Sequence, residues 1–349
     1  MGRTIGHPLH HNDGMTIRVG LIGAGNIGTS HARDLAFAVS GAAVSAVFDA
    51  DAERAHDLAS EVGAIPFARA DDLIGSPDVD AVLIASPDDA HAEQALACLA
   101  AGKPTLCEKP LAPEESDALR VVEAEVAGGR RLIMMGFMRR FDPGYSSLKA
   151  ELGASGIGEP LIVNNIHRNM SAPYGLASER TLTNMVIHEF DINRWLLDEE
   201  YASVQVLTGR SGPYTPDGER DPLLVILQTT SGVLVEIEAF VNARYGYEVI
   251  CRVTGSEGSA VMGDGSYVTR SARGHRGQAV PELWLGRFAD AYRLQLQSWI
   301  DQLSGRGRPA GASAWDGYVA TIVANRAIQA LRSGVRIGVD LPERPPLYT

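Results

Sequence analysis

The chain has 349 residues, enough for about two domains that each bury a hydrophobic core. Hydrophobic residues make up 45% and charged residues 21%, which is typical of a globular protein and excludes a disordered or fibrous one. The 43 acidic and 31 basic side chains give a net charge of −12, which argues against a nucleic-acid-binding surface.

The N-terminal residues and the cysteines indicate the cellular compartment of the protein. The fourteen residues 1–14 contain His7, His10 and His11 with no Cys or carboxylate at ligand spacing, so we expect a disordered extension and no metal. Neither a signal peptide nor a run of 18 apolar residues is present. Three cysteines without C-x-x-C spacing predict free thiols in a reducing compartment, hence a cytoplasmic protein without a membrane partner.

Short strands and helices alternate over residues 15–137. Short apolar runs predict buried strands, at 17–22, 43–48, 81–85, 105–107 and 132–135. Helical patterns lie between them, running up to residue 38 and then at 52–62, 91–101 and 114–127. This alternation predicts the α/β class: a doubly wound parallel sheet of the Rossmann type, which forms an N-terminal domain.

Strands follow one another more directly over residues 138–349. Strand candidates occur at 159–167, 202–208, 223–229, 233–239 and 249–253, and short turns join several of them. Helices are expected at about 185–197 and 288–303. The pattern predicts a C-terminal α+β domain with a large, mostly antiparallel sheet, one face of which stays open.

A glycine-rich turn joins the first strand to the first helix. Gly23 permits the tight turn, Gly25 lets a pyrophosphate approach the backbone, and Gly28 lets the helix pack on the strand. Asn26 and Ile27 lie at the positive end of the helix dipole, where phosphates bind. The turn therefore predicts a dinucleotide site, although a glycine turn without a ligand is the alternative.

An acidic residue after the second strand indicates which dinucleotide binds. Asp49 lies 21 positions beyond Gly28, where its carboxylate can accept both hydroxyls of the adenosine ribose. The same charge repels a 2′-phosphate, and Asp51 adds to that repulsion. We therefore expect NAD in preference to NADP; a surface aspartate is the alternative.

Two further strands end in residues suited to the same site. Ser86 and Pro87 follow one strand, and Glu108, Lys109 and Pro110 follow the next. Ligands of doubly wound sheets bind outside the carboxyl ends of the strands, so we expect the first four of these residues to contact the cofactor. Lys109 would also hold a substrate oxygen, and Pro110 fixes the backbone after it through a bond that can be cis. A surface Glu-Lys pair is the alternative.

A polar stripe marks a helix in the second domain. Asn184, His188, Asp191 and Trp195 are spaced i, i+4, i+7 and i+11, which predicts that they share one helix face. Histidine is suited to removing a hydroxyl proton near neutral pH. The stripe therefore makes His188 a candidate catalytic base, with a buried structural histidine as the alternative.

These motifs carry a resemblance to a known family. From about residue 17 to 348 the chain resembles the glucose–fructose oxidoreductase, inositol dehydrogenase and MocA (Gfo/Idh/MocA) family, and most of all its bacterial inositol 2-dehydrogenase branch. The stretches that carry it are the glycine turn, 108–110, 136–142, 187–191, 241–247, 290–292 and 313–318. Met-Arg-Arg-Phe-Asp at 138–142 and Trp-Asp-Gly-Tyr at 315–318 are the more specific ones.

The resemblance implies an activity. It implies an NAD-dependent dehydrogenase that oxidises a secondary ring hydroxyl of a cyclitol, such as an inositol or inosamine, to the ketone, and that assembles as a homotetramer. His188 matches the family's catalytic base and Lys109 its catalytic lysine. The positions implied to contact substrate are Arg139, His167, Asn169, Asp191 and Tyr247. Three alternatives remain: a pyranose dehydrogenase, a net non-redox enzyme with tightly bound NAD (glycoside cleavage or epimerisation), and a nucleotide sensor.

One residue departs from the family pattern. Inositol dehydrogenases usually carry Asp four residues before the catalytic histidine, and this chain has Asn184. An amide oxygen accepts a hydrogen bond but brings no negative charge to balance the protonated imidazole. Three explanations are open: a substrate that needs less help from the base, compensation by Asp191, or an altered catalytic residue.

Overall fold

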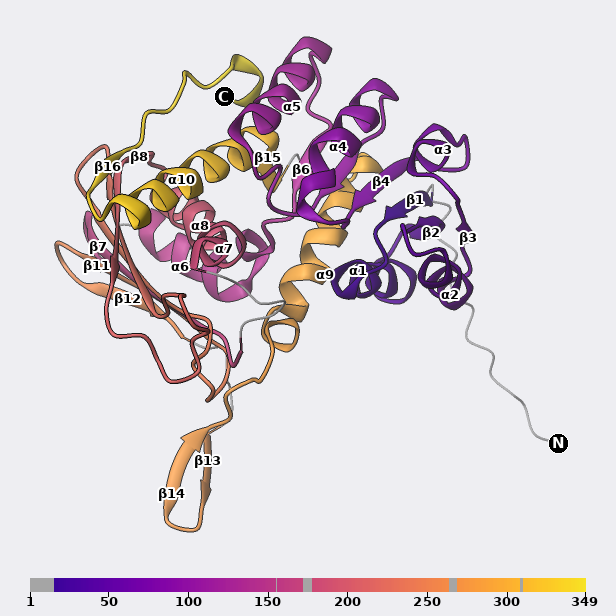
Figure 1. Ribbon diagram of the computed structural model, residues 1–349. Coiled ribbons are helices and arrows are strands. Elements are labelled where there is room, and N and C mark those ends of the chain that lie inside the picture. The colour runs from indigo at the N-terminus through magenta and orange to yellow at the C-terminus, as the bar shows by residue number, and fades with distance from the viewer. Residues whose placement is uncertain (1–15, 155, 172–177, 264–268, 308–309) are drawn as a thin grey trace.

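The computed structural model describes residues 16–154, 156–171, 178–263, 269–307 and 310–349. The predicted extension at 1–14 lies outside the described residues. Two seven-stranded sheets, each with its own helices, lie on opposite sides of the molecule (Figure 1). No helix in the described ranges is long and apolar enough to cross a membrane.

The first sheet has the predicted doubly wound form. Its strand order is β15-β6-β5-β4-β1-β2-β3, and all neighbours are parallel except β15 and β6. Every residue of the central strand β4 is buried, as expected for a strand with helices on both faces of the sheet. The strands are β1 (Ile17–Ile22), β2 (Ala42–Phe48), β3 (Ile65–Pro66), β4 (Ala81–Ile84), β5 (Thr105–Cys107), β6 (Ile133–Met135) and β15 (Ala312–Ser313). The helices of this half are α1 (Asn26–Phe37), α2 (Ala52–Val62), α3 (Ala70–Gly75), the 3-10 turn η1 (Asp88–Ala90), α4 (His91–Ala100) and α5 (Glu115–Gly128).

The second sheet is mostly antiparallel, as predicted. Its order is β12-β11-β7-β10-β9-β8-β16, and only β7 and β10 are parallel neighbours. Burial alternates along β9 and β10, so one face packs on helices while the other stays open (Figure 1). The strands are β7 (Pro160–Arg168), β8 (Tyr201–Thr208), β9 (Leu223–Thr229), β10 (Leu234–Phe240), β11 (Glu248–Gly255), β12 (Ser259–Met262) and β16 (Ile337–Gly338). A separate hairpin, β13 (Thr269–Ala272) and β14 (His275–Gln278), projects from the body.

Short helical elements connect the two sheets near the cavity described below. The 3-10 turn η2 and helix α6 follow the first sheet, and Asp142 caps α6 by accepting bonds from the backbone N–H groups of Gly144 and Tyr145. A π-helical turn, η4, precedes α8 directly. These elements are η2 (Met138–Phe141), α6 (Pro143–Gly153), α7 (Ser178–Arg180), η4 (Thr181–Met185) and α8 (Ile187–Leu197).

The last part of the chain returns to the first half. Helix α9 (Trp284–Leu303) packs on α1 and η2, and β15 extends the first sheet. Helix α10 (Ala314–Ser333) then packs on α5 of the first half and on α8 and β8 of the second; the chain ends after the 3-10 turn η5 (Pro346–Tyr348). Residues far beyond the predicted boundary at 137 therefore join both halves.

Helix α10 was not among the predicted helices. Thirteen of its 20 residues are buried, because it contacts both halves. Residues 317–324 are all buried, so this part of the helix lacks the polar face that gives an amphipathic pattern. The capping box at residues 313–316 could have predicted where this helix begins. Ser313 Oγ accepts a hydrogen bond from the Asp316 backbone N–H, and the Asp316 carboxylate accepts one from the Ser313 backbone N–H.

Candidate active site

A cavity of about 580 Å³ lies where the two halves meet, a volume within the range of small-molecule sites. The first turn of α1 and the segments after β4 and β5 form its first wall, and η4, α8, β7 and Tyr247, just before β11, contribute to the second. Sequence-predicted residues that line it are Asn26, Ile27, Ser86, Glu108, Lys109, His167, Asn169, Asn184, His188 and Tyr247.

The three glycines of the turn are needed for different structural reasons. Gly23 has a φ of +98°, and a Cβ on it would lie 2.4 Å from the Ala85 carbonyl oxygen. A Cβ on Gly28 would lie 1.9 Å from the carbonyl oxygen of Gly23. A Cβ on Gly25 would meet no protein atom within 4 Å, and Gly25 begins α1 without a capping side chain. Protein packing thus requires the outer two glycines, while the middle one leaves open space at a helix N-terminus, which fits a pyrophosphate.

This difference gives a testable contrast. Gly25→Ala is expected to leave the thermal midpoint of unfolding unchanged and to weaken NAD binding by about tenfold or more, equal to about 1.4 kcal/mol, because the new methyl group occupies the phosphate's space. Calorimetric titration with NAD measures the change. Gly128→Ala, on α5, also meets no atom within 4 Å and should alter neither quantity. Unchanged NAD affinity in Gly25→Ala would refute this position for the pyrophosphate.

Asp49 ties the end of β2 to the glycine turn. Its carboxylate accepts hydrogen bonds from the backbone N–H groups of Ala24 (2.6 Å) and Asp51 (2.8 Å). The guanidinium of Arg54, which the sequence analysis did not consider, lies 3.7 Å away. The carboxylate is therefore fixed beside the turn, at the position expected for a ribose contact, with one cation next to it.

Lys109 lies two residues after the end of β5, and the Lys109–Pro110 bond that follows it is cis, one of the two isomers that the sequence allows. Its Nζ donates to the backbone oxygen of Asn184 (3.1 Å) and to the Oδ1 atom of the same residue (3.3 Å). Burial lowers the pKa of Lys109, while the charges of Glu108 and Asp88 oppose that change. The lysine therefore bridges from the first half to the π-helical turn of the second.

Glu108 immediately precedes Lys109 and bonds to its backbone. It is buried, and its carboxylate pairs with His31 Nε2 at 2.8 Å and accepts from the backbone N–H of Lys109 at 3.2 Å. Burial alone would raise the pKa of Glu108, but the hydrogen bond and charge of His31 and the charge of Lys109 hold it below its usual value. A Cβ on Gly136 would lie 2.8 Å from this carboxylate, so the glycine leaves room for it.

His188 lies on the first turn of α8 and lines the cavity, with 8% of its surface exposed. Its Nδ1 is buried without a hydrogen-bond partner among the described residues. Burial lowers its pKa well below the usual value, and the charges of Arg139 and Lys109 lower it further. The neutral imidazole, the form that can take a proton, is therefore favoured.

Asn184 does not support His188 as the family pattern suggests. It lies in the π-helical turn before α8, and its side chain bonds to Lys109 and Asp88; within the described residues it makes no hydrogen bond to His188. The predicted regular helix at 185–197 starts at residue 187 instead. Because the π turn changes the spacing, the predicted i, i+4 relation does not describe this pair.

A buried network lies behind the cavity wall. His167 Nδ1 lies 3.0 Å from the Glu189 carboxylate, and His167 Nε2 lies 3.2 Å from the Tyr247 hydroxyl. Arg139 pairs with Glu189 and lies 3.1 Å from His167. Arg139 is 1% exposed and does not line the cavity, so the structure places it behind His167, away from the position expected of a substrate ligand.

Asp191 also differs from the expectation of a substrate contact. Its carboxylate is 1% exposed, accepts from Arg140 Nε at 2.9 Å, and does not line the cavity. The reason is that η2 brings Arg140 against α8, which supplies the ion partner that a buried carboxylate needs. Asp191 is therefore not placed to compensate for Asn184.

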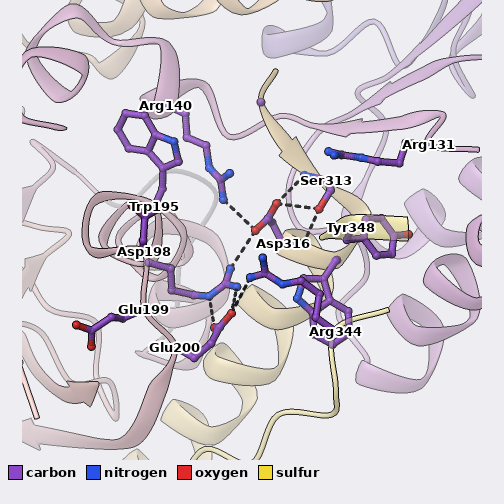
Figure 2. A pocket seen from close by; sticks show the side chains of 13 residues that line it. Arg131, Arg140, Trp195, Asp198, Glu199, Glu200, Ser313, Asp316, Arg344 and Tyr348 are labelled. Carbon is purple, nitrogen blue, oxygen red and sulfur yellow. Dashed lines mark hydrogen bonds and ion pairs between the residues drawn. The ribbon is translucent and has the colours of Figure 1, made fainter. Parts of the chain in front are cut away.

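The same arginine joins a network that holds α8 in place. The Asp316 carboxylate lies 3.2 Å from the guanidinium group of Arg140 and 3.3 Å from that of Arg194. Figure 2 shows Arg140 and Asp316 pointing toward each other. Arg194 also pairs with Glu200 at 2.6 Å. The network connects η2, α8 and α10, so the Trp-Asp-Gly-Tyr stretch serves to position the helix that carries His188.

The remaining predicted residues lie near the cavity without lining it. These are the backbone positions Gly23, Gly25 and Gly28, the ribose candidate Asp49, and Pro87, which is exposed where η1 begins. Further residues line the cavity that were not predicted from the sequence, including Asp88, His91, Arg180 and Trp284. Tyr292 also lines it and lies in the 290–292 stretch that resembles the family. Asp88 could have been found because it follows β4 at the binding edge of the sheet.

Comparisons with known proteins agree with the fold. Residues 17–137 match a family model described as an oxidoreductase family with an NAD-binding Rossmann fold. Residues 156–340 match the model of that family's C-terminal alpha/beta domain.

Three relatives are similar over nearly their whole length. The chain is 46% identical to inositol 2-dehydrogenase 1 of Saccharopolyspora erythraea, covering 96% of this chain and 99% of that protein. It is 42% identical to inositol 2-dehydrogenase/D-chiro-inositol 3-dehydrogenase of Shouchella clausii, covering 96% and 97%. The crystal structure of myo-inositol dehydrogenase from Lactobacillus casei with NAD(H) and myo-inositol matches with a TM-score of 0.93, at 34% identity, covering 96% and 100%.

Proposed function

Because the chain belongs to the Gfo/Idh/MocA oxidoreductase family, we propose that it is an NAD-dependent dehydrogenase that oxidises a secondary ring hydroxyl of a cyclitol, myo-inositol or a related inositol, to the ketone. The observation that carries the proposal is that Lys109 and His188, from different halves, line one cavity that begins at the glycine turn. Residues 15–137 would bind the cofactor, and residues 138–349 would bind substrate and form the oligomer.

In this reaction the protein would remove the hydroxyl proton of the substrate and stabilise the negative charge that develops on the same oxygen. NAD, held at the glycine turn and beside Asp49, would supply the acceptor for the hydride that leaves the carbinol carbon. His188 takes the hydroxyl proton, since its neutral imidazole is the favoured form. Lys109 donates a hydrogen bond to the same oxygen and stabilises the negative charge that develops there.

Polar groups on the opposite wall suit a ring with many hydroxyls. Asn169 Oδ1 is buried and has no hydrogen-bond partner among the described residues. His167 and Tyr247 form a pair on the same wall, which could bind further hydroxyls. Leaving such an acceptor unpaired costs about 1–3 kcal/mol, so a polyol that pairs with it gains affinity over an apolar ligand.

A panel of cyclitols and aldoses with NAD and NADP tests the proposal, with absorbance of the reduced cofactor as readout. The expected result is NADH formation that depends on an inositol. Faster reaction with an aldose would favour the pyranose dehydrogenase. Substrate conversion without accumulation of NADH would favour the non-redox enzyme. A higher rate with NADP would refute the role given to Asp49 and assign Arg54 to the 2′-phosphate.

We also propose a cytoplasmic homotetramer that pairs through the open face of the second sheet. Ile162 and Leu234 lie side by side on β7 and β10, and each is 41% exposed. An apolar patch on an uncovered sheet marks an interaction site.

Lysine at both positions is expected to reduce the mass measured by light scattering, because charges cannot be buried at such an interface. Phe37→Lys, an exposed apolar position on α1, is the control and should leave the mass unchanged. A tetramer in the double variant would refute this interface.

A further inference from the structure

The side-chain amide of Asn184 connects a cation to a carboxylate. Its Oδ1 lies 3.3 Å from Lys109 Nζ, and its Nδ2 lies 3.3 Å from Asp88 Oδ2. An ammonium group only donates and a carboxylate only accepts, so the two partners fix which end of the amide faces which group. The result is a continuous chain of hydrogen bonds from Asp88 through Asn184 to Lys109.

We propose that Asp88 is a positioning residue that supplies, through the Asn184 amide, the negative charge that Asn184 itself lacks, and that it holds the Lys109 ammonium at the cavity. The proposal rests on the proposed function, since it assigns Asp88 to the dehydrogenase site. It also explains the departure from the family pattern in a way that the sequence alone did not suggest. The carboxylate at the end of this chain of hydrogen bonds comes from the first half of the molecule.

The placement of Asp88 supports this role. It is the first residue of η1, four positions after the end of β4, and it lines the cavity and is partly buried. Within the described residues its carboxylate takes part in no ion pair, and it accepts a hydrogen bond from the side chain of Asn184. His91 bridges the Ser86 and Pro110 carbonyl oxygens, which fixes the loops after β4 and β5 relative to each other.

The charges around Lys109 show why a second carboxylate matters. The carboxylate of Glu108 already pairs with His31, so Lys109 does not have this carboxylate to itself. Burial lowers the pKa of Lys109, and Arg139 acts in the same direction, while Glu108 and Asp88 raise it. His188 faces the same cavity and carries no charge until it takes the proton. Removing the charge of Asp88 would therefore weaken both the protonation and the orientation of the lysine.

Three variants separate charge from structure. Asp88→Asn keeps a side chain that can accept from Asn184 but removes the charge, and it is expected to lower kcat by about tenfold or more while the KM for NAD stays constant. Asn184→Asp places two carboxylates side by side. The double variant reverses the hydrogen bond between the two positions and returns one carboxylate, now in contact with Lys109, so kcat should recover most of its loss. Asp89→Asn, at the exposed neighbouring position, is the matched control.

A second readout does not depend on turnover. Acylation of Lys109 by acetic anhydride, followed across pH by mass spectrometry without substrate, reports its pKa because only the neutral amine reacts. Asp88→Asn should shift this labelling to lower pH, and Asp89→Asn should not. If the wild-type protein oxidises no cyclitol, the proposed function fails while the labelling still tests Asp88. Wild-type labelling in Asp88→Asn, or a double variant no faster than Asp88→Asn, would overturn the proposal.

Discussion

Replacement of His188 by asparagine is expected to lower kcat for inositol oxidation by roughly 10²–10⁴-fold, the usual contribution of a general base. The His188 imidazole lines the cavity, and its lowered pKa favours the neutral form. The other two histidines that line the cavity are already bonded, since His167 pairs with Glu189 and His91 bridges two carbonyl groups. Steady-state kinetics at saturating NAD and inositol measure the loss.

Binding and stability separate a catalytic effect from damage to the fold. His188 Nδ1 has no hydrogen-bond partner among the described residues, so the asparagine leaves no protein group unpaired. The variant should therefore keep the wild-type affinity for NAD and the wild-type thermal midpoint. A loss of kcat below tenfold with both controls unchanged would remove His188 from the role of base.

The pH profile of the wild-type enzyme provides an independent check. An ordinary histidine has a pKa of about 6.5. Burial and the charges of Arg139 and Lys109 lower the pKa of His188, so the base form persists to lower pH. The acidic decline of kcat/KM is therefore expected below pH ~6.5, and a decline centred above that value would contradict the assignment.

The parts of the fold that were predictable depend on local patterns. β1, β4 and β5 are short apolar runs, and the glycine turn between β1 and α1 has the spacing expected of a strand-to-helix turn that approaches a pyrophosphate. Lys109 was identifiable for the same reason, because it follows a strand at the edge where ligands bind. The positions of these residues can be predicted from their neighbours in the sequence, because tertiary contacts do not change the local structure around them.

Side-chain partners across the fold could not be predicted. Helical spacing put Asp191 on the face of His188, but the partner that decides its role is Arg140, 51 positions away. Helix α10 was missed because contacts with both halves bury most of its surface. Asn184 seemed to weaken the base, yet the structure joins it to Lys109 and Asp88. For Asp191 and Asn184 a long-range contact changes the role of a residue that the sequence pattern had singled out, and for α10 long-range contacts hide the helical pattern itself.

Glu189→Ala is expected to have the largest effect on stability, lowering the free energy of unfolding by about 3–5 kcal/mol, as for other broken buried ion pairs. Glu189 is 0% exposed, and its carboxylate pairs with Arg139 and His167. Removing it leaves the guanidinium of Arg139 buried without its counter-charge. Unfolding by urea, followed by circular dichroism, measures the change.

A surface pair provides the contrast for this prediction. Glu115 pairs with Arg326 at 2.6 Å in a partly exposed position, so Glu115→Ala should cost only about 0–1 kcal/mol. Methionine at both Arg139 and Glu189 should recover part of the stability, because it removes both charges together. Equal losses in Glu189→Ala and Glu115→Ala would show that the buried pair is solvated.

The pH dependence of the same pair has a defined sign. Burial alone would raise the pKa of Glu189, but Arg139 and His167 hold it below the usual value of about 4.3. A carboxyl whose pKa is lower in the folded state stabilises the protein fully above its unfolded pKa, and this contribution is lost as the pH falls through the folded pKa. The difference in stability between wild type and Glu189→Ala should therefore be constant above pH ~5 and shrink below pH ~4. A difference that stayed constant down to low pH would show that the charge of Glu189 does not contribute.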